Sequence, residues 1–174
     1  LGWHKNVVFH ATSLEEINQI TLHFPLNKIH LAPNIPSPSL PLTVLKEKQK
    51  GQLRLVSLAR IAPEKNIRFA LDLLLMFKKN FPDITSVTFD QYGSTYNKTY
   101  LSQCQEGANL LLPAIKTTFN GSLPSKLVHA TLQHYDFLLF PTLGENNGHA
   151  IVQPWGAGLP VQISDATPWK DLEK

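Results

Sequence analysis

The chain has 174 residues, the length of one domain with a small appendage. Apolar residues make up 43% of the sequence, enough to bury a core, which argues against a disordered chain. The net charge of +3 is too small to indicate nucleic acid as a partner. The single cysteine excludes an internal disulfide framework, and no apolar run is as long as a membrane span. We therefore expect a cytoplasmic protein.

The amino-terminal part of the sequence predicts two short strands with a helix between them. Apolar runs at residues 7–9 and 28–31 are typical of strands. Ser13 and Glu16 have the spacing of a capping box, which predicts that a helix begins beside them.

A proline-rich stretch follows. Four prolines between Pro33 and Pro41 exclude a helix or a central strand, so we interpret residues 33–52 as a linker. A modest basic cluster lies around its end, formed by Lys46, Lys48, Lys50 and Arg54. We interpret this cluster as a solvated surface, and weak attraction to anionic lipid is the alternative.

From residue 53 onward the patterns of strands and helices alternate. Strands are expected at residues 53–59, 84–89, 115–119, 137–140 and 161–163, and helices at 67–79, 96–105, 125–133, 149–157 and 167–172. This alternation predicts an α/β fold with a doubly wound parallel sheet. Such sheets bind ligands at the carboxyl ends of their strands, so the turns after the strands are the candidate site.

Two of these turns carry groups suited to an anionic ligand. In the first, Arg60 follows a strand and Lys65 opens a helix, an arrangement that could hold a diphosphate. Two solvated loop charges are the alternative for this segment taken alone. In the second, Gly144 and Gly148 allow the backbone to approach a ligand, and Glu145 could accept hydrogen bonds from sugar hydroxyls. Glu145 could equally serve only to complement a helix dipole.

These segments together resemble the retaining, family-4 (group 1) glycosyltransferases, which have the two-domain GT-B fold. The strongest similarity is Gly144-Glu145-Asn146-Asn147-Gly148-His149-Ala150-Ile151-Val152, followed by Gly158-Leu159-Pro160-Val161. Leu58-Ala59-Arg60-Ile61-Ala62-Pro63-Glu64-Lys65-Asn66 and Phe119-Asn120-Gly121 also fit. The tail Thr167-Pro168-Trp169-Lys170-Asp171-Leu172 is similar to members from bacterial surface-polysaccharide pathways.

The resemblance implies a division into three parts. Residues 1–32 would be a remnant of the amino-terminal acceptor domain and residues 33–52 an interdomain linker. Residues 53–174 would form the Rossmann-like, nucleotide-sugar-binding half of the GT-B fold, incomplete at its carboxyl end. The partners implied are a nucleoside-diphosphate sugar and the missing acceptor domain, with peripheral contact at the inner face of the membrane. We expect this fragment alone to be inactive.

The resemblance also assigns roles to single residues. Arg60, Lys65, Asn147 and Gly148 would bind the donor diphosphate, and Glu145 would be the catalytic residue. Glu145, Asn146 and His149 would contact the sugar, Gln153 the ribose, and Ser122 and Leu123 the base. No metal and no cofactor are expected.

Three positions depart from the family pattern. Gln153 replaces the usual second glutamate, Asn147 replaces an aromatic residue, and Pro154 falls inside an expected helix. The spacing from Glu145 to Gln153 predicts that both side chains share one helix face. The departures keep open a second hypothesis, a non-catalytic nucleotide- or glycan-binding module. A receiver or flavodoxin-like protein is less favoured, because receivers need a cluster of acids at their strand ends.

Overall fold

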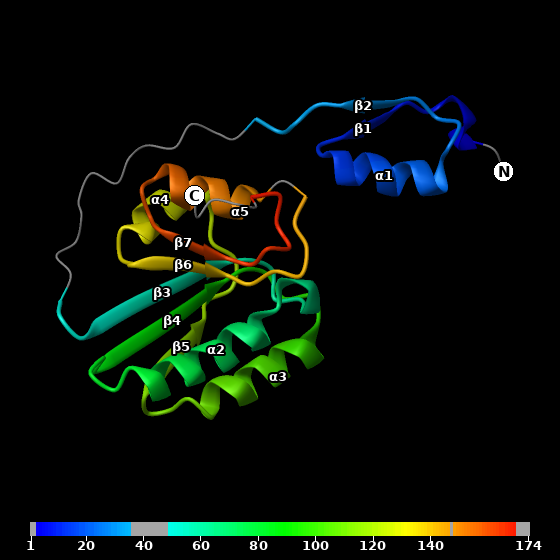
Figure 1. The fold of residues 1–174 in the computed structure, drawn as a ribbon. Helices are drawn as coiled ribbons and strands as arrows, with labels where there is room; N and C mark the ends of the chain where they lie inside the picture. The colour runs from blue at the N-terminus through cyan, green and yellow to red at the C-terminus, as the bar shows by residue number, and fades with distance from the viewer. Residues whose placement is uncertain (1–2, 36–48, 147, 170–174) are drawn as a thin grey trace.

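The computed structural model describes residues 3–35, 49–146 and 148–169. The amino-terminal part has the two strands and the helix that we expected, although the first strand begins two residues later than predicted, and the two strands pair in parallel. Its elements are a 3₁₀ turn at Trp3–Asn6, β1 (Phe9–Ala11), α1 (Leu14–His23) and β2 (Ile29–Leu31), and β1 pairs with β2 (Figure 1). No residue of α1 is buried; Leu22, for example, is 81% exposed.

The predicted capping box begins α1, with one change in its partners. The Ser13 hydroxyl accepts a hydrogen bond from the Glu16 N–H at 3.1 Å. The Glu16 carboxylate accepts from the N–H of Thr12 at 2.6 Å and from the Thr12 hydroxyl at 2.7 Å. These hydrogen bonds, that of the Thr12 backbone foremost, lower the pKa of Glu16.

The rest of the described chain forms a five-stranded parallel sheet with the order β5-β4-β3-β6-β7. The strands are β3 (Gln52–Leu58), β4 (Ser86–Tyr92), β5 (Ile115–Phe119), β6 (Phe137–Phe140) and β7 (Val161–Ile163). The chain starts at the centre, moves to one edge, and returns to build the other half. The predicted doubly wound parallel fold is therefore confirmed.

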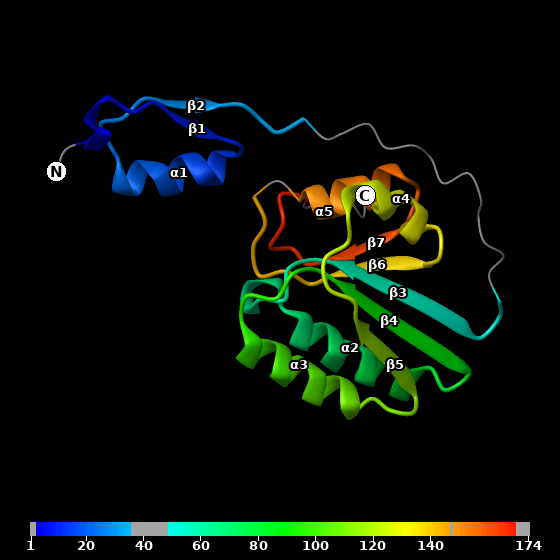
Figure 2. The ribbon, with the colours of Figure 1, turned by 180° about the vertical axis from the view of Figure 1, so that it is seen from behind.

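Helices cover both faces of this sheet. A 3₁₀ turn (Pro63–Lys65) leads into α2 (Ile67–Asn80), which lies with α3 (Lys98–Asn109) on one face. The opposite face carries α4 (Ser125–Leu132) and α5 (His149–Gly156), and Figure 2 shows the two layers from behind. None of the described helices has the length and apolar composition needed to cross a membrane.

β6 is buried on both faces of the sheet from Leu138 to Phe140, as a central strand requires, while its first residue, Phe137, is exposed. Leu139 packs in the core beneath α2 and α3, while Leu138 and Phe140 pack in the core beneath α4 and α5. The two cores are separate, and β6 contributes to both.

An ion pair fixes the central strands at their amino ends. The Arg54 guanidinium contacts both Asp136 oxygens, at 3.1 Å from Nε and 2.9 Å from Nη2, and the Arg54 N–H donates to Asp136 at 2.8 Å. Hydrogen bonding to Asp136 raises the pKa of Arg54. Our interpretation of Arg54 as part of a solvated linker cluster is therefore wrong; Lys46 and Lys48 lie outside the described residues.

A second polar group lies within the α4–α5 side of the sheet. The Tyr135 hydroxyl donates to Asp90 at 2.7 Å and lies 3.2 Å from the Tyr92 hydroxyl, and the Thr118 hydroxyl also donates to Asp90. Burial, together with the hydrogen bonds to Tyr92 and Asp90, raises the pKa of Tyr135.

Some element boundaries differ from those predicted. β4 extends to Tyr92, three residues past the expected end, because tertiary partners hold Asp90 and Gln91 in the sheet. The helix expected at residues 167–172 does not begin at its predicted start: Thr167 and Pro168 form a bend, and residues 170–172 lie outside the described range.

Candidate functional site

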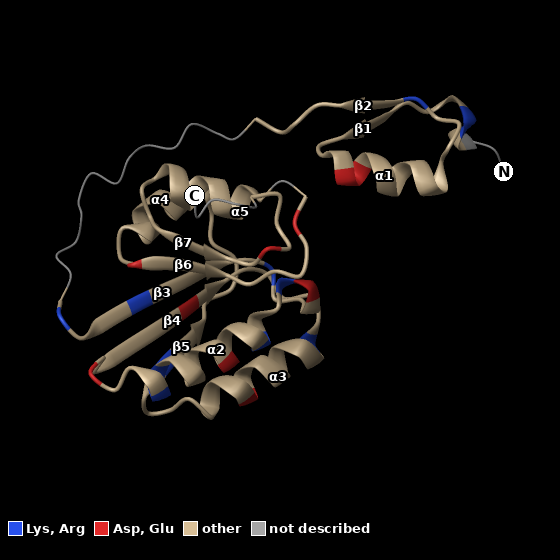
Figure 3. Cartoon of the chain, in the orientation of Figure 1, with Lys and Arg blue, Asp and Glu red and all other residues tan. Residues whose placement is uncertain are grey.

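The candidate site lies where the strand order reverses, between β3 and β6. Hydrogen bonds join the turns that follow these two strands. The Leu143 N–H donates to the Glu64 carbonyl at 2.8 Å, and the buried Thr142 hydroxyl lies 3.1 Å from the same oxygen. Figure 3 shows basic and acidic residues together at this end of the sheet.

Lys65 and Glu145 form an ion pair across this junction. Nζ of Lys65 lies 2.7 Å from Oε2 of Glu145, and the side chains are 14% and 20% exposed. The ammonium also lies 5.5 Å from the centre of the Phe140 ring, a cation–π distance. Lys65 is in the 3₁₀ turn before α2, not at the start of α2 itself, because Asn66 has a left-handed backbone conformation.

The second oxygen of Glu145 holds the turn that precedes α5. Oε1 accepts a hydrogen bond from the Gly148 N–H at 3.3 Å. Gly148 has φ 67° and ends this turn, so α5 begins only at His149. Glu145 therefore lies before the helix, and our expectation that it shares a helix face with Gln153 is wrong. Asn147 lies outside the described residues.

Arg60 is the most exposed cation of the site. Its side chain is 57% exposed, pairs with Glu64 at 3.3 Å, and lies 5.8 Å from the centre of the Tyr96 ring. The exposed guanidinium is thus accessible to an anion, whereas the Lys65 ammonium is held in a more shielded ion pair.

Two residues that the sequence did not single out hold the backbone just before Arg60. The buried Gln91 amide donates to the Ala59 carbonyl at 2.6 Å. At Gly93, an added Cβ would lie 1.8 Å from the same carbonyl oxygen, so only glycine fits there. The available signal for this close approach was the glycine, Gly93, that interrupts the apolar strand pattern after Tyr92.

The turn after β5 carries the residues expected to meet a base. The Gly93 N–H donates to the Gly121 carbonyl at 2.7 Å, which joins this turn to the end of β4. Ser122 is exposed, whereas Leu123 is partly buried against the α4–α5 core.

The remaining predicted contacts lie within α5 and just before it. Asn146, His149 and Gln153 are exposed. Pro154 is buried inside α5, which continues to Gly156. The helix thus tolerates this proline, although it carries no N–H for a hydrogen bond within the helix.

Neither a thiol nor a metal cluster marks this site in the described part of the chain. Cys104 is buried in α3, and burial raises the pKa of its thiol, so it is a poor nucleophile. Across the described ranges, no three His, Cys, Asp or Glu side chains gather as metal ligands would.

The sequence and the fold were compared with known proteins. Residues 45–174 match the family model described as "Glycosyl transferases group 1". A search of curated proteins found no significant match.

Several solved glycosyltransferases share the fold at low sequence identity. The pneumococcal O-GlcNAc transferase GtfA, solved with UDP and GlcNAc, is 20% identical with a TM-score of 0.63, covering 91% of this chain and 30% of its own. A point mutant of S. aureus TarM, solved with UDP, is 13% identical with a TM-score of 0.64, covering 90% and 29%. A UDP-forming trehalose-phosphate synthase from Burkholderia xenovorans is 11% identical with a TM-score of 0.71, covering 92% and 47%. The chain thus spans less than half the length of each of these proteins.

Proposed function

This chain belongs to the group 1 glycosyltransferases, and from that premise we propose that its five-stranded domain binds the nucleoside-diphosphate sugar donor of a retaining transfer reaction. The observation that carries the proposal is the meeting of Lys65 with Glu145 at the reversal of the strand order. This is where doubly wound sheets place nucleotides. A cation there suits a diphosphate, and a carboxylate suits sugar hydroxyls.

The proposed chemistry is displacement at the anomeric carbon of the sugar. The bond from that carbon to the diphosphate oxygen breaks, a bond to an acceptor hydroxyl oxygen forms on the same face, and the hydroxyl proton passes to the departing diphosphate. The diphosphate leaves with the bonding electrons. Arg60 and Lys65 would stabilise its developing charge, together with the N–H of Gly148, and Glu145 would orient the sugar.

Other contacts of the donor follow from the same placement. Ser122 and Leu123 would meet the base, Gln153 the ribose, and Asn146 and His149 the sugar. UDP is the first candidate nucleotide, because the solved structures of GtfA and TarM hold UDP. We expect no requirement for a metal.

The role of the whole protein is proposed on the resemblance alone. It would act in bacterial polysaccharide or glycolipid synthesis, in the cytoplasm or at the inner face of the membrane, with an acceptor-binding domain beside the donor domain. The second candidate is a non-catalytic nucleotide- or glycan-binding module, which the replacement of a glutamate by the exposed Gln153 favours.

Titration calorimetry with UDP and a panel of other nucleoside diphosphates, in the presence of EDTA, tests donor binding. Binding should persist in EDTA, and Arg60→Ala should weaken it by about 1.5 kcal/mol, roughly tenfold, the lower end for a charge-assisted contact.

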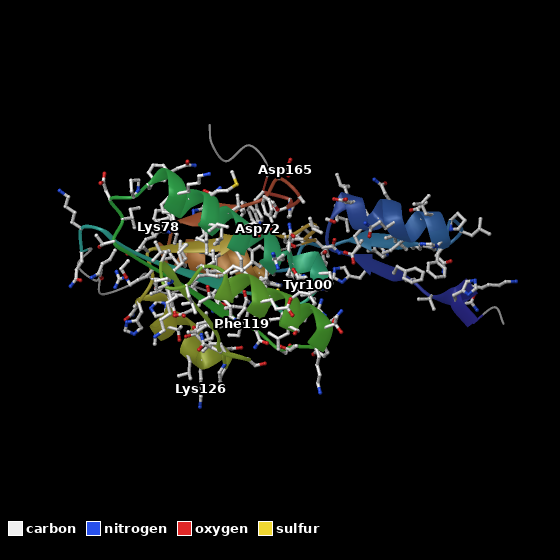
Figure 4. The ribbon with its side chains drawn as sticks, turned by 90° about the horizontal axis from the view of Figure 1, so that it is seen from below. Asp72, Lys78, Tyr100, Phe119, Lys126 and Asp165 are labelled. Atoms are coloured by element: carbon white, nitrogen blue, oxygen red, sulfur yellow. The ribbon has the colours of Figure 1, made fainter. Side chains whose placement is uncertain are left out.

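Lys79→Ala is the matched control. Lys79 is exposed and lies in the last turn of α2, whereas the candidate site lies before the first turn of that helix. Figure 4 shows its neighbour Lys78 at the opposite end of the α2–α3 layer from Tyr100. Binding that requires Mg²⁺ or Mn²⁺, or that is equally weakened by both substitutions, would contradict the proposal.

A further inference from the structure

Trp169 carries a buried donor group that is unpaired within the described structure. It follows β7 and packs against the α4–α5 core, with its ring edge-on to Trp155 at 5.8 Å between centres and 77° between planes. Its Nε1 is shielded from solvent and has no hydrogen-bond partner among the described residues. A buried N–H without a hydrogen-bond partner is energetically costly, so the position of this indole is unfavourable unless a partner reaches the N–H in some state of the protein.

The unpaired N–H lies beside the Glu145 turn. The point where a Cβ of Gly148 would lie is 3.0 Å from Nε1 of Trp169 and 3.5 Å from Cγ of Glu145. The indole N–H and the Glu145 side chain are therefore neighbours across Gly148. A side chain at position 148 would separate them, and the φ of 67° there also favours glycine.

Glu145 can accept from this donor. In the described structure Oε2 is held by Lys65 at 2.7 Å and Oε1 by the Gly148 N–H at 3.3 Å. A carboxylate has about four acceptor sites, so Oε1 and Oε2 each retain capacity. If Lys65 turns toward a diphosphate, the Glu145 carboxylate loses its cation, and the nearby indole N–H is a replacement donor.

We propose that Trp169 is a positioning residue: its indole N–H donates a hydrogen bond to the Glu145 carboxylate when Lys65 moves away from that carboxylate. This inference rests on the proposed function, because the departure of Lys65 is assigned to the binding of a diphosphate. The new hydrogen bond would hold Glu145 at the sugar side of the donor while the ammonium neutralises the phosphates.

The test that needs no ligand is NMR of the indole N–H groups in the ¹⁵N-labelled chain. The sequence has three tryptophans, so Trp3→Phe and Trp155→Phe variants assign the Trp169 signal. Lys65→Met removes the cation without a ligand. We expect a downfield shift and slower solvent exchange of the Trp169 proton, no change at Trp155, and reversal in Lys65→Met/Glu145→Ala. An unchanged Trp169 signal in Lys65→Met, or a shift that survives Glu145→Ala, overturns the proposal.

A binding arm separates this inference from the proposed function. Trp169→Phe should weaken UDP, UDP-N-acetylglucosamine and UDP-glucose about fivefold, the loss of one hydrogen bond, and leave UMP unchanged, because only a diphosphate would draw Lys65 away from Glu145. A merely structural Trp169 would weaken UMP and the diphosphate ligands alike, and that result overturns the inference. Failure of all nucleotides to bind the native chain, with the Lys65→Met shift present, refutes the proposed function and leaves the Trp169–Glu145 contact established.

Discussion

Nζ of Lys65 lies 2.7 Å from Oε2 of Glu145, although the two residues are 80 positions apart in the sequence. The positive charge of the site is therefore partly neutralised by the site's own acid, while the more exposed Arg60 stays accessible. Under the proposed function, a diphosphate that enters would have to draw Lys65 away from Glu145. The affinity for the diphosphate thus includes the cost of separating this ion pair.

Glu145→Gln should tighten the binding of UDP a few-fold, by about 0.5–1 kcal/mol, the range of a partly exposed ion pair. The substitution frees Lys65 and removes a like charge from beside the phosphates. Calorimetry with UDP measures the change, and Glu106→Gln, an exposed acid near the end of α3, is the control. Weaker or unchanged UDP binding would mean that Glu145 does not compete with the diphosphate for Lys65.

Gln153→Glu should tighten UDP by about 0.5–1.5 kcal/mol, because a carboxylate accepts two hydrogen bonds from vicinal hydroxyls where an amide offers one oxygen. The gain should vanish for 2′,3′-dideoxy UDP, which lacks these hydroxyls. Equal gains on both nucleotides would show that Gln153 does not face the ribose. The absence of any gain would favour the non-catalytic module.

Gly93→Ala should destabilise the fold by about 3 kcal/mol, the upper range for overpacking, because its Cβ would lie 1.8 Å from the Ala59 carbonyl oxygen. Gly144→Ala is the control, since no atom lies within 4 Å of the added group. Urea denaturation compares the two. Similar small effects would show that the ends of β3 and β4 can separate without cost.

Tyr135→Phe should lower the free energy of unfolding at pH 7 by about 1–3 kcal/mol, since it removes the hydroxyl that donates to Asp90 at 2.7 Å. Urea denaturation measures the loss. Tyr96→Phe, whose ring is 76% exposed, is the control and should change the stability little.

The same variant has a pH dependence of known sign. The folded pKa of Tyr135 is raised, so the phenol stays protonated in the folded chain while the unfolded chain ionises above about pH 10. The native chain should therefore lose stability as the pH rises past about 10, and Tyr135→Phe should lose less. Parallel losses in the two proteins would contradict the raised pKa.

The sequence predicted most of the fold because the apolar patterns are local. The strands at 115–119, 137–140 and 161–163 have the expected bounds. The start of α3 was misplaced by two residues, because the Asn97 side chain caps it through the Tyr100 N–H at 2.9 Å. The pattern of apolar residues alone does not report such a cap.

The candidate site was less accessible to sequence reasoning. The types of Arg60, Lys65 and Glu145 indicated an anion and a sugar, yet their pairing depends on which strands are neighbours. The roles of Gln91 and Trp169 were missed for the same reason. Gln91 donates to the carbonyl of Ala59 at the end of the neighbouring strand, and Trp169 lies beside the turn at Gly148, in another segment of the chain.

The strand order has a consequence for synthesis on the ribosome. β3 forms the centre of the sheet, and its neighbours β4 and β5 are made directly after it, so Arg60 and Lys65 emerge with one half of the sheet. β6, which brings Glu145 to Lys65, is made only after β5 and α4 and must insert on the open side of β3. Until then the growing chain displays two cations with no acid from the second half. The Lys65–Glu145 pair can therefore close only once β6 has joined β3, while α5 and the edge strand β7 are still to be added.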